Sequence, residues 1–595
     1  MKARTTSSDS PVGGGGSVGG TPGSAPSGRP GGSVAAPSPA DLRARAPRLL
    51  GLLTYAVGLL DLLGALARVQ RPRLAVAEVL PGVVTVSVAA SVLTGVLLLA
   101  LGHGLRRRKR RAWRAVVGLL AVSTLAALVR FSPLHVVVPL TLLVVLLVRR
   151  DDFRAASDPQ SRWRAVRVAL TLVVVDLVVG LGLVYAASRG EVGGAPTLLD
   201  ALGESLFGLI GLDGPLTFRD DRTGDLVGTA LAALGLLTLA ATASVVLRAS
   251  EPRGELSPTD EGRMRPLLAT DGDSLGYFAL RADKSLVWSP SGRAAIAYRV
   301  VGGVMLASGD PVGPRDAWPE VMAAFAARAA EHAWTVAVLG CSEDAGEVWA
   351  RETGLAALEL GDEAVLHTGD FSLDGRAMRN VRQMVSRIRR KGYGTQVHRV
   401  RDLDDDLRAT VLADAAAWRE SETERGFSMA LGRVADPRDP DAVLVTAWEG
   451  GRVRAMLQLV PWGRDGLSLD VMRRDADAAP GVNELMIEAV MQQAAALGVG
   501  RVSLNFAAFR SVFERGERLG AGPLLRLRRS ALIVASRWFQ IESLYRFNAK
   551  FQPEWISRYL LYPSAADLPR VSLAVLEAEA FLVWPTWRRL REGQA

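Results

Sequence analysis

The stretch 375–392 combines residue types whose spacing suits contact with a polyanion. On a helix with about 3.6 residues per turn, its apolar side chains share one face and its arginines share the other. A solvated surface helix normally mixes both signs of charge, whereas this stretch contains no acid. The pattern favours contact with RNA or anionic lipid over a plain surface helix. Its seven cations are Arg376, Arg379, Arg382, Arg387, Arg389, Arg390 and Lys391.

A second basic cluster leads into the aromatic stretch 530–547, which is interpreted either as a wall for an acyl chain or as a core helix. The terminal stretch 572–587 is interpreted either as a helix docked at a membrane interface or as a packed terminal helix. The basic residues of the cluster are Arg515, Arg518, Arg526, Arg528 and Arg529.

Metal and disulfide chemistry find few residues to support them. Cys341 is the single cysteine, which excludes an internal disulfide and any multi-cysteine metal site. The five histidines are scattered without ligand spacing. No metal site is therefore expected, and Cys341 is expected to be a buried thiol.

The two halves of the chain differ in charge. Residues 1–248 carry 27 Lys and Arg against 15 Asp and Glu, a net of +12. Residues 249–595 carry 44 against 46, a net of −2. This asymmetry excludes a uniformly basic nucleic-acid binder and predicts two different kinds of domain within the 595 residues.

The first half is expected to lie in a membrane. Residues 1–42 are rich in Gly, Ser and Pro and are predicted to be disordered. Within 43–248, each apolar stretch approaches the ~20 residues that a spanning helix needs. The shorter stretch 197–212 is expected to be interfacial or re-entrant. The six predicted spans are 46–67, 80–105, 112–129, 131–148, 165–187 and 226–247.

Charged residues around these spans give an orientation. Arginines gather before the first span, after the second and after the fourth, whereas the alternate loops carry fewer. The positive-inside rule then places both termini and the second half in the cytoplasm. Nucleic-acid binding is the alternative interpretation of these arginines. Asp61 and Asp176 lie within spans, as functional acids or as carboxylates hydrogen-bonded inside the bundle.

The second half has the periodicity of an α/β protein after a charged linker at 249–270. Two blocks, within 294–339 and 442–506, share the order hairpin, loop, helix and strand. They predict tandem related domains over 271–395 and 396–595. This order resembles the GNAT acyltransferase fold, which binds the pyrophosphate of acyl-CoA at a helix start. The matching loops lack that fold's glycine spacing, so an acyl donor other than coenzyme A is expected, with no cofactor.

An ordered set of short strings makes the second half similar to a known family. Any one string is weak, but together they cover about 271–562 in the family's order. The chain resembles the bacterial phosphatidylglycerol lysyltransferases, the multiple peptide resistance factor proteins. The strings are WSPSGR at 288–293, GDPVG at 309–313, GDEA at 361–364, FSLDGRAMRN at 371–380, SLDVMRR at 468–474 and KFQPEW at 550–555.

The resemblance implies a cytosolic tandem GNAT-like α/β (α+β) region attached to membrane helices, which here would be the six-helix region predicted from the apolar stretches. It implies a bacterial cell-membrane enzyme that transfers an aminoacyl group, lysyl by the family's name, from aminoacyl-tRNA to phosphatidylglycerol. The product reduces negative surface charge and so confers resistance to cationic antimicrobial peptides. Only six spans are predicted, so no full lipid-translocating region is expected. The chain ends soon after Trp587, so ready-made aminoacyl-tRNA is expected as the donor. Homo-oligomerisation is left open.

The resemblance also carries over the family's essential residues Asp470, Arg473 and Lys550. Asp470 either binds the α-ammonium of the donor or assists the nucleophile, and Arg473 pairs with a phosphate. Lys550 either stabilises the oxyanion or binds lipid phosphate. A structural salt bridge is the alternative for each. Weaker substrate-binding candidates are Glu484, Asn505, Arg558 and Tyr559, and the candidates for tRNA or lipid phosphate contact are Arg376, Arg379, Arg382, Arg387 and Arg390.

Two other functions are compatible with the sequence. One keeps the aminoacyl-tRNA donor but changes the acceptor to another lipid or an amine. The other is a non-catalytic lipid transporter or sensor. The strings at 470–473 and 550–555 favour an enzyme, and the sequence leaves the transferred amino acid open.

Overall fold

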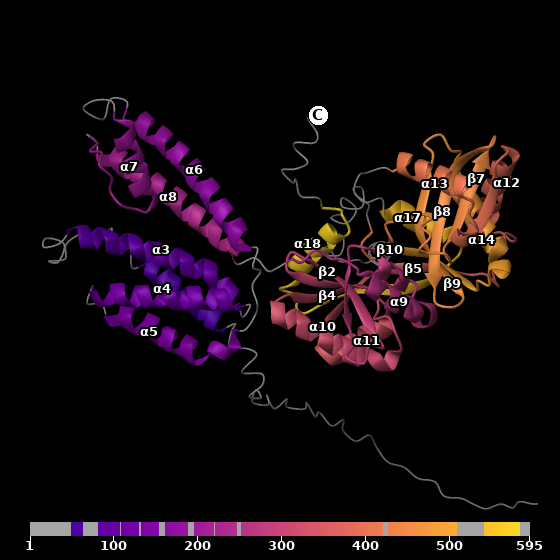
Figure 1. Ribbon diagram of the computed structural model, residues 1–595, viewed down its shortest axis with the longest axis horizontal. Coiled ribbons are helices and arrows are strands. Elements are labelled where there is room, and N and C mark those ends of the chain that lie inside the picture. Colours follow the sequence, from indigo (N-terminus) through magenta and orange to yellow (C-terminus); the bar gives the residue numbers. More distant parts are fainter. Residues whose placement is uncertain are drawn as a thin grey trace, which may run out of the picture. The chain divides into compact units, whose positions relative to one another are not determined.

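The computed structural model has a helical N-terminal part and an α/β C-terminal part (Figure 1). The residues that the structure describes are 49–63, 81–106, 109–129, 133–153, 161–188, 196–218, 221–246, 251–419, 426–508 and 541–582.

The predicted apolar stretches are helical wherever the structure describes them. Two segments, Val166–Ala187 and Arg222–Ala243, are long and apolar enough to cross a membrane. A membrane region is thus supported, and the count of six spans stays a prediction. The stretch expected to be interfacial forms the short helix α7 (Leu198–Leu209). The two long segments lie within α6 (Ser161–Ala187) and α8 (Asp221–Val246). The remaining helices of this part are Leu49–Leu63, α3 (Pro81–Arg106), α4 (Arg110–Val129) and α5 (Pro133–Val148).

The two acids within the apolar helices are buried and hydrogen-bonded to neighbouring helices. Asp61 accepts a hydrogen bond from Ser123 Oγ of α4 at 3.0 Å. Asp176 of α6 accepts one from Thr238 Oγ1 of α8 at 2.6 Å. Interhelical hydrogen bonds of this kind hold helices together where water is scarce. This geometry favours the second interpretation, carboxylates bonded inside the bundle.

The α/β part is organised around a single eleven-stranded sheet of order β1-β2-β3-β4-β11-β5-β10-β9-β8-β7-β6. The N-terminal half of the α/β part supplies the strands at the β1 end of this order, and the C-terminal half supplies those at the β6 end. The strands are β1 (Ser285–Trp288), β2 (Ala295–Val301), β3 (Val304–Ser308), β4 (Thr335–Cys341), β5 (Ala356–His367), β6 (Gly394–Arg399), β7 (Val443–Glu449), β8 (Arg452–Trp462), β9 (Gly466–Arg474), β10 (Arg501–Ala508) and β11 (Glu554–Tyr562).

Both halves contain the repeated unit predicted from the sequence. In the first, the antiparallel pair β2–β3 is followed by α10 (Trp318–His332) and by β4, which lies parallel to β3. In the second, the antiparallel strands β7, β8 and β9 are followed by α14 (Val482–Leu497) and by β10, parallel to β9. A parallel neighbour requires a crossover, which the helix provides in each case.

The halves exchange strands, which the sequence analysis did not foresee. Strand β5 leaves the first half and pairs with β10 of the second. Strand β11 returns from the second half and pairs with both β4 and β5. Backbone hydrogen bonds therefore run across the predicted division at 395 and 396, which stays a prediction for the domain boundary.

Different elements cover the two faces of the sheet around β7, β8 and β9. On one face, α12 (Arg379–Arg390) and α14 pack with Leu457, Leu467 and Leu469. On the other face, α13 (Asp405–Ala417) packs with Met456 and Val471. These two apolar clusters distinguish the faces on which the candidate site residues lie.

Lys284, which precedes β1, is fully buried and gives stability a pH dependence. Its Nζ donates to Phe278 O and to Ser308 Oγ, each at 2.8 Å. Burial, together with the nearby Arg281, lowers the pKa of Lys284 to about 7, from about 10.4 in an unfolded chain. Between these values the unfolded chain binds more protons, so stability rises with pH, by at most about 1.4 kcal/mol per unit.

The variant Lys284→Met is expected to lose this rise between about pH 7 and 9. The comparison is the thermal unfolding midpoint of wild type and variant across that range. Other titrating groups are common to both proteins and cancel in the difference. The exposed Lys391→Met serves as the control and should follow wild type. Parallel pH curves for wild type and Lys284→Met would contradict the prediction.

Candidate functional site

The candidate site lies where β9 and β10 part. Their parallel ladder joins only Gly466–Ser468 to Arg501–Ser503, although both strands continue beyond it. The pairing of β10 with β5 is also interrupted, between Ser503 and Phe506. Asn505 lies in this gap with φ of +68°, and its Nδ2 donates to Leu469 O at 2.9 Å. A side-chain amide thus replaces backbone pairing where the strands separate.

Asp470 is the extra residue of a bulge in β9. Across the ladder, Gln458 faces Val471 while Leu459 faces Leu469, which leaves Asp470 without an opposite residue. A bulge of this kind bends the strand and redirects the side chain. The Asp470 carboxylate accepts from the Leu431 backbone N–H at 2.7 Å and from Gln458 Nε2 at 2.6 Å.

The bulge brings Asp470 and Arg473 to one face of the sheet. In a regular strand, residues three apart point to opposite faces. Here Arg473 Nη1 donates to Ala415 O of α13 at 2.7 Å, and Val471 packs in the same cluster. Gln458, which bonds to Asp470, also bonds to Ala435 of that cluster. The two candidate residues therefore lie on the α13 side.

Gln458 fixes both the carboxylate of Asp470 and the loop 431–439, which precedes β7. Its Oε1 accepts from the Ala435 backbone N–H at 2.7 Å, and its Nε2 donates to Arg433 O at 2.9 Å as well as to Asp470. The side chain is 2% exposed. Because each polar atom of this amide is bonded, it cannot flip without losing partners.

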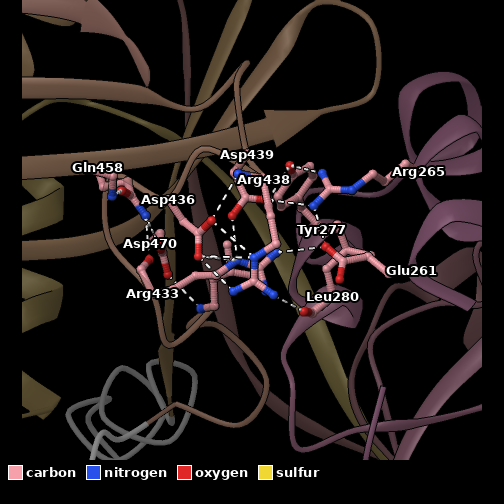
Figure 2. A network of polar contacts seen from close by, with 12 residues as sticks. Glu261, Arg265, Tyr277, Leu280, Arg433, Asp436, Arg438, Asp439, Gln458 and Asp470 are labelled. Atoms are coloured by element: carbon pink, nitrogen blue, oxygen red, sulfur yellow. Dashed lines mark hydrogen bonds and ion pairs between the residues drawn. The ribbon is translucent and has the colours of Figure 1, made fainter. Parts of the chain in front are cut away.

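A buried ion pair holds the same loop against the N-terminal half of the α/β part (Figure 2). Asp439 accepts from Arg433 Nε at 2.5 Å and Nη2 at 2.9 Å. It also accepts from Tyr277 OH at 2.9 Å and from Arg265 Nη2 at 3.0 Å. Burial alone would raise the pKa of Asp439, but the guanidinium of Arg433 holds it below its usual value. Residues of both halves thus support Asp470 indirectly.

Lys550 is paired with Glu484 on the α14 side of the sheet. Its Nζ lies 2.8 Å from Glu484 Oε1 and 5.3 Å from the centre of the Phe547 ring. Glu484 is buried in the first turn of α14, whereas the Lys550 side chain is 35% exposed. Lys550 follows α17 (Ile541–Ala549). The predicted residues therefore form two groups, Asp470 with Arg473 and Lys550 with Glu484, on different faces.

Arg558 lies at the junction of the two halves, where β11 meets β5. Its guanidinium pairs with Asp273 at 2.7 Å, donates to Ser274 Oγ at 2.6 Å and pairs with Glu363. The side chain is 2% exposed. Burial alone would raise the pKa of Asp273, but Arg558 lowers it below its usual value. Tyr559, the next residue, packs in the core of the first half.

The predicted cationic helix exists as α12, with the expected apolar face. Val381, Val385 and Ile388 are buried, and the remaining helix surface is largely polar. Arg389 pairs with Glu488 of α14 at 2.8 Å, and Arg382 donates to the Leu373 carbonyl. Four predicted phosphate-contact residues are exposed and make no ion pair within the described part of the chain: Arg376, Arg379, Arg387 and Arg390. Arg382 is largely used by the fold.

Gln458, Arg433 and Asp439 were missed by the sequence analysis. No spacing in the sequence joins them to Asp470, because their proximity depends on the β8–β9 register and on a loop more than twenty residues away. The basic cluster at 515–529 and residues 583–587 of the terminal stretch lie outside the described residues.

Comparison with known families now decides the identity. The profile described as "Phosphatidylglycerol lysyltransferase, C-terminal" matches residues 265–562, half of the chain. The chain belongs to this family. The resemblance carried by the ordered strings is thereby confirmed. A second profile, described as "Transmembrane region of lysyl-tRNA synthetase", matches residues 42–247 and agrees with the helical part.

Similar proteins carry related names. The lysylphosphatidylglycerol biosynthesis bifunctional protein LysX of Mycobacterium sp. (strain JLS) is 44% identical over 474 residues, 75% of this chain and 41% of the relative. Its namesake in Nocardia farcinica is 41% identical over 496 residues, 81% of this chain and 43% of the relative. The chain thus spans less than half the length of these curated relatives. The structure of L-PGS from Bacillus licheniformis matches with a TM-score of 0.48 and 21% identity, over 56% of this chain and 99% of that chain.

Proposed function

We propose that the chain is a membrane-bound aminoacyltransferase that moves a lysyl group from lysyl-tRNA to phosphatidylglycerol. The observation that carries the proposal is the Asp470 carboxylate, held by two donors at a bulge beside the parting of β9 and β10 in a member of this family. The names of the similar proteins, which refer to lysylphosphatidylglycerol biosynthesis, support the choice of lysine and of the lipid.

Asp470 binds the α-ammonium of the aminoacyl group. Hydrogen bonds to a carboxylate favour its charged form, and Asp470 already accepts two from Leu431 and Gln458. Of the two roles considered for Asp470, this arrangement favours a fixed negative charge that orients the donor. It does not favour a base that removes the proton of the nucleophile.

The reaction is a transesterification, for which no cofactor is needed. The lipid hydroxyl attacks the ester carbonyl of lysyl-tRNA, and a new ester bond forms on the lipid. The bond between the carbonyl carbon and the tRNA ribose oxygen breaks, and that oxygen takes up the proton of the lipid hydroxyl and leaves as a hydroxyl. The main requirements are orientation and stabilisation of the oxyanion. Lys550, partly exposed and anchored by Glu484, supplies a positive charge for the oxyanion or for lipid phosphate. Arg473, anchored at Ala415, supplies one for a phosphate.

The rest of the chain serves the two substrates. The proposed six spans within 43–248 hold the enzyme in the bacterial membrane, with both termini and the catalytic region in the cytoplasm. The exposed arginines of α12 and Arg376 contact tRNA phosphates. The proposed domains are 271–395 and 396–595, after the linker 249–270. Lysylated lipid lowers the negative charge of the surface and thereby confers resistance to cationic peptides.

The proposal is tested with purified protein in liposomes that contain phosphatidylglycerol. Transfer RNA charged separately with radiolabelled lysine, alanine, arginine or ornithine is added, and label is followed into extracted lipid. Label from lysyl-tRNA, lost after treatment with ribonuclease, supports the proposal. Absence of label from every donor would overturn it, and label from a different donor would overturn the choice of lysine.

A further inference from the structure

A cavity lined by arginines lies away from Asp470 and is lined by none of the site residues predicted from the sequence, although Arg265 and Tyr277 of the Asp439 network contribute to its wall. Its volume is about 630 Å³, and both halves of the α/β part contribute to it. Arg265 comes from the helix α9 (Pro258–Asp271) of the first half, and the other lining arginines come from the second half. The five lining arginines are Arg265, Arg399, Arg401, Arg438 and Arg464, against two lining acids, Asp441 and Asp465.

Three of these arginines are neutralised by carboxylates. Arg265 pairs with Glu261 and Asp439, and Arg401 pairs with Asp441. Arg438 pairs with Asp436 at 2.7 Å. Figure 2 shows Arg265 and Arg438, with Arg438 in the middle of the network beside Asp436 and Arg265 at the end opposite Asp470.

The other two arginines keep their charge uncompensated within the described residues. The two Nη atoms of Arg399 donate only to backbone carbonyls, Asp441 O at 2.8 Å and Leu497 O at 2.7 Å. Arg464 is exposed in the turn between β8 and β9 and makes no ion pair in the described part of the chain. A guanidinium presents its donors in a fork that matches phosphate oxygens.

We propose that this cavity binds a backbone phosphate of the tRNA donor, through Arg464 and Arg399. The inference rests on the proposed function and adds a second contact region to it. Strand β9 begins at Gly466 in the cavity wall and reaches Asp470 four residues later, about 13 Å along the strand at 3.3 Å per residue.

This separation distinguishes the two phosphate-bearing substrates. The phosphate of phosphatidylglycerol is joined to the reacting hydroxyl by only a few bonds, so it must lie close to the reacting ester. Phosphates of tRNA recur at every nucleotide, so one of them reaches the cavity while the aminoacyl end lies at Asp470. The geometry therefore selects RNA over a lipid headgroup.

The test measures binding of lysine tRNA that carries no amino acid. The full chain is held in a non-ionic detergent, and the KCl concentration is varied between about 50 and 200 mM. Each phosphate contact contributes about one unit to the slope of log affinity against log salt. Arg464→Gln is expected to weaken binding and make the slope shallower by about one, and Arg399→Gln to do the same. Arg464→Glu is expected to weaken binding further. Arg351→Gln, at an arginine with a 66% exposed side chain on α11 (Glu343–Thr353), is the matched control and should bind as wild type does.

Arg399 also bonds to the fold, so the decisive variants are those of the turn residue Arg464. A wild-type slope in both Arg464→Gln and Arg464→Glu would overturn the proposal. It would also be overturned if Arg464→Gln left tRNA binding unchanged but weakened the binding of short-chain phosphatidylglycerol. Failure of the proposed function looks different, because wild type itself would then show no salt-dependent binding of tRNA and no transfer to lipid.

Discussion

The variant Asp470→Asn is expected to lower kcat/KM for lysyl transfer by about 100-fold or more, because it removes the charge that holds the donor ammonium. Asparagine has the size of aspartate and still accepts from the Leu431 N–H, so the loop should remain in place. Activity is measured as labelled lysine in lipid, and folding as the thermal unfolding midpoint. Asp477→Asn, at an exposed acid between β9 and α14, is the control and should keep wild-type activity. Near wild-type turnover in Asp470→Asn would contradict the assignment.

A donor without the α-amino group separates ammonium binding from proton transfer. Transfer RNA charged with 6-aminohexanoate keeps the ε-ammonium of lysine and lacks the α-ammonium. Wild type is expected to use it as poorly as Asp470→Asn uses lysyl-tRNA, and the variant should not lower that rate further. If Asp470 instead removes the proton of the lipid hydroxyl, Asp470→Asn reduces transfer from both donors by the same factor.

The repeated units and the amphipathic helix could be predicted because they depend on local patterns. Apolar stretches on either side of the turn Gly450-Gly451 mark β7 and β8, and the 3.6-residue period marks α12. Both signals are contained within about twenty residues of sequence. The strand exchange had no such signal, because the sequence of β11 does not show which strands it pairs with.

The arrangement of the candidate site could be predicted only in part from the sequence. Asp470 and Arg473 were expected together, but a regular strand would have separated them, and the bulge that unites them has no motif. Gln458 is an ordinary strand residue until the β8–β9 register places it 2.6 Å from Asp470. Lys550 and Glu484 are 66 residues apart and meet through tertiary packing. Charge spacing on α12 predicted which side faces outward, but not that Arg389 would pair with Glu488.

Arg558 is held in ion pairs within the fold, whereas the sequence analysis gave it as a candidate for substrate binding. Its guanidinium is occupied by Asp273, Ser274 and Glu363. Glu363 in turn accepts a hydrogen bond from Ser503 at the point where β10 leaves β9. Arg558 thus compensates the buried carboxylate of Glu363 and the partly buried one of Asp273, and it supports the point where the strands part through Glu363.

Replacement of Arg558 by methionine is expected to destabilise the α/β part by about 3–5 kcal/mol, because removing one partner leaves buried charges unpaired. Without the guanidinium, burial raises the pKa of the remaining carboxylates, so the folded variant binds more protons than the unfolded chain. The deficit relative to wild type should therefore grow as pH rises and shrink as pH falls. Thermal unfolding between about pH 6 and 8 measures it. Arg351→Met, an exposed arginine, should stay within about 0.5 kcal/mol of wild type. Adding Glu363→Gln to Arg558→Met should recover part of the loss, and a deficit independent of pH would contradict the ion-pair explanation.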